Sequence, residues 1–209
     1  MTKIKICGLK RKEDIEYANA LLPDYIGFVF AKSARQVTRA QAQELKRLLN
    51  PRIKAVGVFV KEEVTQIAKI ANTGIIDVIQ LHSDETPEFC QMLKRLTKVP
   101  VIKVIRVKNA DDLKKLERFT CNYFLLDTYS EARYGGVGKA FDYAILQQAV
   151  IPKPYFIAGG LAADNVGEVI AATHPYGVDV SGSVETNGVK DLAKMQKFIL
   201  AVRGGKDND

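Results

Sequence analysis

The sequence predicts a single (β/α)₈ barrel, that is, an α/β fold with its active site at the carboxyl ends of the strands. Eight short runs rich in β-branched and aromatic residues alternate with longer segments that carry apolar residues at helical spacing. Eight such units in 209 residues fit a minimal barrel. A doubly wound sheet usually has fewer strands and a clearer nucleotide fingerprint. Several strand runs are almost continuously apolar, which is typical of a sheet covered on both faces.

Polar residues in the strand runs also favour a closed sheet. Lys5 lies in the first run and Asp179 in the last, and these strands are neighbours only in a barrel. We therefore predict an ion pair between them, with Gln80, Lys103 and Asp127 as further candidates for the polar interior. The strands are expected at Ile4–Cys7, Tyr25–Phe30, Lys54–Val60, Val78–Leu81, Val101–Val107, Tyr123–Leu126, Tyr155–Ala158 and Val178–Val180.

The segments between the strands have the apolar spacing of amphipathic helices. Thr38 and Gln41 have capping-box spacing, and Thr86-Pro87 predicts a capping hydroxyl before a proline at the first helical position. We assign residues 1–203 to the barrel and expect 204–209 to form a frayed polar tail. The apolar residues that mark the helices fall within 15–22, 42–49, 64–71, 89–96, 113–116, 144–148, 166–170 and 192–202.

The composition is that of an ordinary globular protein, at 47% hydrophobic and 26% charged residues. No apolar run approaches the roughly 18 residues of a membrane span, and we expect no signal peptide, because residues 3–7 already have the pattern of a strand. The net charge of +7 is spread along the helices without an aromatic-rich basic cluster. We therefore expect no nucleic-acid or membrane partner, and a positive field that would attract a small anionic substrate.

The three cysteines, Cys7, Cys90 and Cys121, are an odd number without C-x-x-C spacing. This argues against a disulfide framework and a zinc site, and for a reducing cytoplasm. Cys7 ends the first predicted strand on the same face as Lys3 and Lys5. That position suits a catalytic thiol, because barrels build their sites at the strand ends, although a free cysteine also packs as a small apolar residue.

Asp127 follows Leu125-Leu126 at the tip of the sixth strand, where an apolar wall could raise its pKa and make it a general acid. The alternative is that it caps a turn. Strands 1 and 6 are three apart in an eight-strand ring, so Cys7 and Asp127 could face a ligand from opposite sides of the barrel mouth.

Glycine-rich loops follow the last three strands. Residues 134–140 are neither a P-loop nor a dinucleotide fingerprint, because Arg133, Ala140 and Phe141 occupy required positions, so we expect a flexible active-site loop. Gly159-Gly160 and Gly182-Ser183 follow strands 7 and 8, where barrels commonly bind phosphate through backbone N–H groups. Each loop alone could be only a turn.

Arg35 follows the second strand and could pair with a substrate carboxylate, although a solvated loop arginine is commoner. His82 follows the fourth strand without an obvious partner nearby in the sequence, so we expect it to line the site. His174, beside Pro175, is expected at a helix end, and the two histidines make no convincing metal site.

Several short fragments occur in order along the chain, namely Lys5–Leu9, Gly27–Phe30, Ser33–Arg35, Gly57–Val60, Gln80–His82, Leu126–Thr128 with Gly135–Lys139, Gly159–Leu161 and Val178–Ser181. Together these fragments resemble the phosphoribosylanthranilate isomerase family of tryptophan biosynthesis. The resemblance runs from Lys3 to about Phe198 and is specific because all the fragments occur at barrel-strand spacing.

The resemblance implies a barrel enzyme without metal or organic cofactor that performs an Amadori rearrangement on a phosphorylated, carboxylated small molecule. It implies that Asp127 is the general acid that opens the furanose ring and that Cys7 is the general base that takes the C2′ proton. Arg35 would hold the anthranilate carboxylate. The predicted substrate-binding residues are Arg35, Gly159, Gly160, Gly182, Ser183, His82, Gln80 and Asp179. Lys5 could help to lower the pKa of Cys7.

The chain departs from the family pattern at Ser83, at Ser181-Gly182-Ser183 and at Asn187, where glycine, Ser-Ser-Gly and proline are usual. These changes affect loop 4 and the phosphate loop and leave the acid, the base and the arginine intact. Two alternatives remain open: an epimerase or a Schiff-base lyase using Lys103, and a non-catalytic anion-binding barrel. We expect a cytoplasmic monomer or homodimer.

Overall fold

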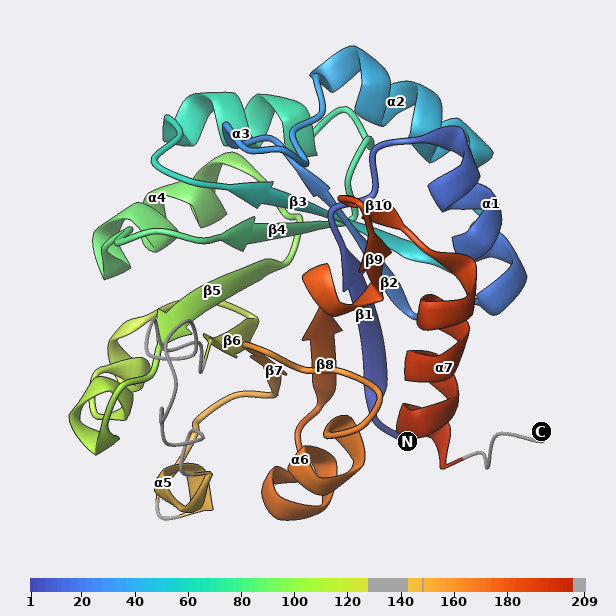
Figure 1. The fold of residues 1–209 in the computed structure, drawn as a ribbon. Coiled ribbons are helices and arrows are strands. Elements are labelled where there is room, and N and C mark those ends of the chain that lie inside the picture. The colour runs from blue at the N-terminus through green and yellow to red at the C-terminus, as the bar shows by residue number, and fades with distance from the viewer. Residues whose placement is uncertain (128–142, 148, 205–209) are drawn as a thin grey trace.

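The computed structural model describes residues 1–127, 143–147 and 149–204 and shows a closed barrel of eight parallel strands in the order β1 to β8, surrounded by helices (Figure 1). Each predicted strand is present, with ends shifted by at most one residue. The strands are β1 (Lys3–Cys7), β2 (Tyr25–Val29), β3 (Lys54–Phe59), β4 (Val78–Leu81), β5 (Val101–Arg106), β6 (Tyr123–Asp127), β7 (Tyr155–Ala158) and β8 (Gly177–Val180).

The helical segments follow the strands in sequence and cover the outside of the barrel (Figure 1). A two-stranded antiparallel hairpin and a short 3₁₀ turn follow β8. The α-helices are α1 (Lys12–Leu21), α2 (Arg39–Leu48), α3 (Val64–Ala71), α4 (Pro87–Leu96), α5 (Ala144–Gln147), α6 (Val166–Thr173) and α7 (Leu192–Arg203). The 3₁₀ turns are η1 (Ala110–Leu113), η2 (Leu116–Arg118) and η4 (Gly182–Val184), and the hairpin is β9 (Glu185–Thr186) with β10 (Val189–Lys190).

The barrel closes where β1 pairs with β8, and Lys5 lies opposite Asp179 in that register. Lys5 Nζ donates to Asp179 Oδ1 at 2.8 Å, so the predicted ion pair is confirmed. Strand alternation turns Lys5 and Cys7 into the barrel, while Ile4 and Ile6 pack in the layer between strands and helices.

The barrel interior is filled by one small apolar cluster, and a larger apolar cluster lies between the strands and the helices. Ile102 and Val104 belong to the interior cluster, so Lys103 between them points outward. The expectation of an interior Lys103 is therefore wrong. The interior cluster consists of Tyr25, Val56, Val78, Ile102, Val104, Leu125 and Phe156.

The predicted helix caps are present. The Thr38 hydroxyl accepts from Gln41 N at 3.2 Å, and the Gln41 side chain accepts from Thr38 N at 2.8 Å. Thr86 caps α4 ahead of Pro87, and His174 ends α6 with a left-handed φ of 44°. Gly204 likewise ends α7, while the remainder of the expected tail, 205–209, lies outside the described residues.

The helix expected around Leu113 and Leu116 is two short 3₁₀ turns instead. The apolar residues here are spaced by three, which is the 3₁₀ period, and charged residues between them supply no wider apolar stripe. Among the described helices, none combines the length and the apolar character that crossing a bilayer demands.

Candidate active site

A cavity of about 620 Å³ opens at the carboxyl ends of the barrel strands. It is walled by residues from β1 to β4 and β6 to β8 and the loops that follow several of them, so segments far apart in the sequence contribute to one space. All the residues expected in the site line it, namely Cys7, Arg35, Gln80, His82, Asp127, Gly159, Gly160, Asp179, Gly182 and Ser183.

Cys7 reaches this cavity from the end of β1 and is 9% exposed. Its sulfur lies against Gly27 of β2, because a Cβ at position 27 would stand 2.6 Å from Cys7 Sγ. The absence of a side chain at Gly27 therefore makes the space that the thiol occupies. Cys90 and Cys121 are buried in the layer between strands and helices, so Cys7 is the cysteine placed for chemistry.

The charges around Cys7 oppose one another. Burial raises the pKa of the Cys7 thiol, and Asp179 raises it further, while Lys5 and Lys190 lower it. Burial prevails, so the pKa of Cys7 lies above its ordinary value and the thiol predominates at neutral pH. Lys5 acts in the expected direction on the Cys7 pKa, but it does not bring that pKa below the ordinary value.

Arg35 lies over the turn that follows β1. Gly8 has a φ of +88°, and a Cβ there would overlap with Arg35 Cδ. The guanidinium donates from Nε to Glu185 Oε1 at 2.7 Å and from Nη2 to Glu185 Oε2 at 2.6 Å. Gly8 therefore allows Arg35 to lie across the backbone and reach a carboxylate after β8.

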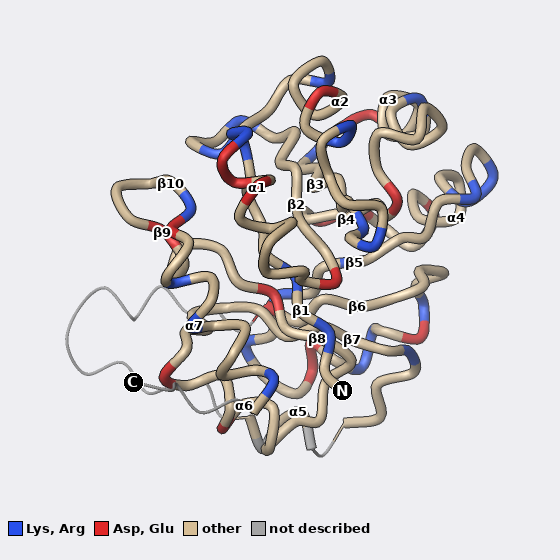
Figure 2. The backbone as a smooth tube through the Cα atoms, turned by 90° about the vertical axis from the view of Figure 1, so that its right-hand side faces the viewer, with Lys and Arg blue, Asp and Glu red and all other residues tan. Residues whose placement is uncertain are grey.

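Glu185 also accepts from Lys190 Nζ at 2.6 Å. These residues lie opposite each other on the β9–β10 hairpin, whose acidic and basic strands lie side by side in Figure 2. Burial raises the pKa of Glu185, but hydrogen bonds and charge from Arg35 and Lys190 bring it down to about 2. Burial lowers the pKa of Lys190, and Glu185 opposes that effect in part.

Glu185 and Lys190 were absent from the site expected from sequence. The signal that could have found them is the Asn187-Gly188 pair between two short runs, which is typical of a two-residue hairpin turn. Such a turn places the residues two before and two after it opposite each other, here a glutamate and a lysine.

Asp127 faces the cavity from the end of β6, with His82 Nε2 at 3.7 Å from its Oδ2. Gln80 Nε2 lies 3.0 Å from His82 Nδ1. With Gln80 donating, His82 carries its proton on Nε2 and presents it to Asp127. Gln80 Oε1 is buried and has no hydrogen-bond partner among the described residues.

The two glycine-rich loops meet at one side of the cavity. Gly159 and Gly160 have φ values of +103° and +67°, and the Ser183 hydroxyl donates to the Leu161 carbonyl. This contact joins the loop after β7 to η4 after β8. The expected loop 134–140 after β6 lies outside the described residues.

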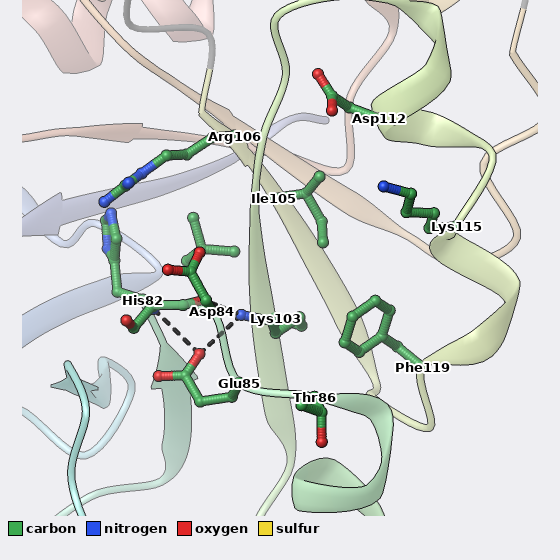
Figure 3. A pocket seen from close by; sticks show the side chains of 12 residues that line it. His82, Asp84, Glu85, Thr86, Lys103, Ile105, Arg106, Asp112, Lys115 and Phe119 are labelled. Atoms are coloured by element: carbon green, nitrogen blue, oxygen red, sulfur yellow. Dashed lines mark hydrogen bonds and ion pairs between the residues drawn. The ribbon is translucent and has the colours of Figure 1, made fainter.

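A second cavity of about 380 Å³ lies at the ends of β4 and β5 (Figure 3). His82 lines this cavity as well as the first. Lys103 Nζ donates to Glu85 Oε2 at 2.7 Å and to the Ser83 carbonyl, and the side chain is 2% exposed. Lys103 is therefore held in a buried ion pair outside the first cavity, which disfavours the Schiff-base alternative. In the described part of the chain, no three His, Cys, Asp or Glu side chains are grouped to hold a metal ion.

Comparison with known proteins shows which family this chain resembles. The family model described as N-(5'phosphoribosyl)anthranilate (PRA) isomerase matches residues 4–201. An N-(5'-phosphoribosyl)anthranilate isomerase of Thermoanaerobacter sp. (strain X514) is 51% identical over 204 residues, covering 98% of this chain and 99% of the relative.

Solved structures agree with this match. Phosphoribosyl anthranilate isomerase from Thermotoga maritima superposes with a TM-score of 0.86 at 35% identity, covering 98% of this chain and 100% of that chain. Another isomerase structure, in complex with reduced 1-(o-carboxyphenylamino)-1-deoxyribulose 5-phosphate, gives a TM-score of 0.81 at 31% identity, with the same coverage.

Proposed function

Because this chain belongs to the N-(5'-phosphoribosyl)anthranilate isomerase family, we propose that Cys7 and Asp127 are the base and the acid of its reaction. The enzyme is the isomerase of tryptophan biosynthesis that converts N-(5'-phosphoribosyl)anthranilate into 1-(2-carboxyphenylamino)-1-deoxyribulose 5-phosphate. The observation that supports the assignment of roles is one cavity lined by a thiol from β1 and a carboxyl from β6.

The reaction begins at the furanose ring. Asp127 donates a proton to the ring oxygen as the bond between that oxygen and C1′ breaks, which leaves a protonated imine between C1′ and the anthranilate nitrogen. The Nε2–H of His82, 3.7 Å from Asp127 Oδ2, faces the carboxylate that this proton transfer leaves, and Gln80 orients the imidazole.

The second proton transfer involves Cys7. Its thiolate takes the proton from C2′, and the electron pair moves into the imine to give an enolamine, which tautomerises to the ketone. Lys5 and Lys190 favour the thiolate that this step requires, against the opposing effect of burial.

The ends of the substrate have separate partners. Arg35 binds the anthranilate carboxylate through a charge-assisted pair, and the backbone of Gly159, Gly160 and Gly182 with Ser183 binds the phosphate. These residues line the same cavity as Cys7 and Asp127. We expect the enzyme to act in the cytoplasm as a monomer or homodimer, which cell fractionation and light scattering would check.

The test is loss of substrate fluorescence, with substrate made from anthranilate and phosphoribosyl pyrophosphate. Cys7→Ala and Asp127→Asn should each lower kcat by roughly 10²–10⁴-fold. Cys90→Ala is the matched control, because Cys90 is buried away from the cavity, and it should retain turnover. Parental kcat in either site variant would remove that residue from the mechanism.

A non-catalytic anion-binding barrel remains the second candidate. It would bind the substrate without turnover in the parent protein, so the same assay distinguishes the two. The lining of one cavity by a buried thiol and a carboxyl favours the enzyme, since a binder of anions gains nothing from either group.

A further inference from the structure

We propose that Glu185 is a positioning residue that holds the Arg35 guanidinium in the orientation that binds the carboxylate of the substrate. Lys190 in turn holds Glu185 in place through a second ion pair. This inference rests on the proposed role of Arg35 and extends it to two residues that do not line the cavity. It makes the β9–β10 hairpin a determinant of specificity for the carboxylated ring.

The argument begins with the guanidinium. Arg35 uses Nε and Nη2 in a two-point contact with both oxygens of Glu185, at 2.7 and 2.6 Å. A guanidinium has five N–H donors in one plane, so Nη1 and the second N–H of Nη2 remain for another acceptor. Two contacts in one plane fix the orientation of that remaining edge, which a single hydrogen bond would leave free to rotate.

The location of Glu185 shows that the substrate does not have to displace it. Arg35 lines the cavity, whereas Glu185 and Lys190 do not. The Glu185 side chain is 7% exposed and the Lys190 side chain is fully buried, while Arg35 is 35% exposed. Glu185 therefore lies behind Arg35 as viewed from the cavity, and a substrate carboxylate approaches the opposite edge.

Lys190 balances the charge of this group. Arg35 and Glu185 alone would form a neutral pair with little attraction for an anion. The Lys190 cation, 2.6 Å from Glu185 Oε1, gives the three residues a net charge of +1. The site thereby gains a positioned arginine and keeps a positive field for the substrate.

The hairpin holds the two residues in register. Asn187 and Gly188 have φ values of +52° and +75°, as the two central residues of a type I′ turn require. This turn places Lys190 opposite Glu185. Arg11 donates to the Lys190 carbonyl at 3.1 Å and Lys194 to the Glu185 carbonyl at 2.8 Å, so the hairpin backbone is tied to α1 and α7.

Two ligands measure the effect directly. One is reduced 1-(o-carboxyphenylamino)-1-deoxyribulose 5-phosphate, and the other is the same compound without the carboxyl group. Isothermal titration gives a Kd for each ligand. The Kd ratio, defined as the Kd of the ligand without the carboxyl group divided by the Kd of the carboxylated ligand, reports the contribution of the carboxylate alone. A general loss of folding or of phosphate binding changes both Kd values and leaves their ratio unchanged.

Glu185→Gln should reduce this ratio about tenfold and raise KM for the substrate more than it lowers kcat. The sign is informative, because Glu185→Gln also makes the site more positive, and charge alone would strengthen binding of the carboxylated ligand. The double variant Glu185→Gln/Lys190→Met keeps the net charge at +1, removes the buried cation and should show the same loss. If Glu185→Gln alone fails to fold, the double variant tests the positioning role of Glu185 in its place.

An unchanged or larger ratio in both variants would overturn the inference. Glu85→Gln is the matched control, since Glu85 forms an equally buried pair with Lys103 away from Arg35, and it should leave the ratio at the parental value. Arg35→Met should abolish the preference for the carboxylated ligand. If Arg35→Met leaves the preference intact, the proposed function of Arg35 fails; if only the Glu185 variants leave it intact, the positioning role alone fails.

Discussion

Lys5 Nζ and the carboxylate of Asp179 lie 2.8 Å apart, although 174 positions separate the two residues in the chain. The Lys5 side chain has no exposed surface and that of Asp179 is 9% exposed. Burial lowers the pKa of Lys5, but Asp179 and Cys7 raise it by more, so Lys5 stays a cation inside the barrel. The pair joins the first strand to the last and places a positive charge two residues before Cys7.

Lys5→Met should destabilise the protein by about 3–5 kcal/mol, because it leaves the Asp179 carboxylate buried without its partner. Urea unfolding would measure this. Lys3→Met on the same strand is the control: Lys3 pairs with Asp24 at the surface, with 44% and 29% of the side chains exposed, and such a pair is worth about 1 kcal/mol or less. Equal losses in the two variants would contradict the buried role of Lys5.

The rate should depend on the ionisation of Cys7. Its pKa is raised and its thiolate is the proposed base, so the residual kcat/KM of Asp127→Asn, in which no acid has to stay protonated, should rise with pH above neutrality. In the same Asp127→Asn background, Lys190→Met removes a cation that favours the thiolate and should move this rise to higher pH. Lys69→Met, which removes an exposed charge on α3, should leave the profile in place. A shift to lower pH in Lys190→Met would refute this view, and thiol titration would show whether Lys5→Met also raises the Cys7 pKa.

Gly27→Ala should impair both folding and turnover, because the new methyl group would lie 2.6 Å from Cys7 Sγ. Overpacking of this kind costs typically about 1–3 kcal/mol. Gly167→Ala is the control, since Gly167 lies in α6 with nothing within 4 Å of the added carbon, and it should stabilise by about 0.5–1 kcal/mol. Adding Cys7→Ala to Gly27→Ala should recover part of the lost stability; no recovery would mean that the sulfur is not the obstacle.

Acid should weaken the contribution of Glu185 to stability. Its pKa falls from 4.5 to about 2 on folding, so the stabilisation is fully present above about pH 4.5 and disappears as the pH falls toward 2. The stability difference between the parent and Glu185→Gln should therefore be largest near neutrality and shrink below pH 4. Urea unfolding at several pH values would check this, and a difference that is constant with pH would contradict it.

The barrel could be predicted from the sequence because its signals are local and repeated. Strand runs such as Val78–Leu81 and Tyr155–Ala158 have the predicted ends, and the Thr38 cap was visible from residue types alone. The direction of Lys103 was predicted wrongly, because alternation along β5 fixes which residues share a face but not which face is inside.

The site was predictable only in part. Cys7, Asp127 and Arg35 were found because strand ends converge in a barrel, and the cavity lining brings them together. Glu185 and Lys190 were not found, since a buried ion pair behind another residue leaves no pattern on a strand end. The Asn187-Gly188 turn that pairs them can be read from the sequence, whereas the space over Gly8, through which Arg35 reaches Glu185, becomes evident only when the chain is folded.

The strand order has a consequence for synthesis on the ribosome. β1 is the first strand to be made, yet one of its two neighbours, β8, emerges only after β2 to β7 have been translated. Until then the Asp179 carboxylate is not available to pair with Lys5, and burying the lysine without a partner would be unfavourable. Nascent chains that end before Asp179 should therefore hold β1 at an open, hydrated sheet edge and acquire a native interior only once β8 has emerged.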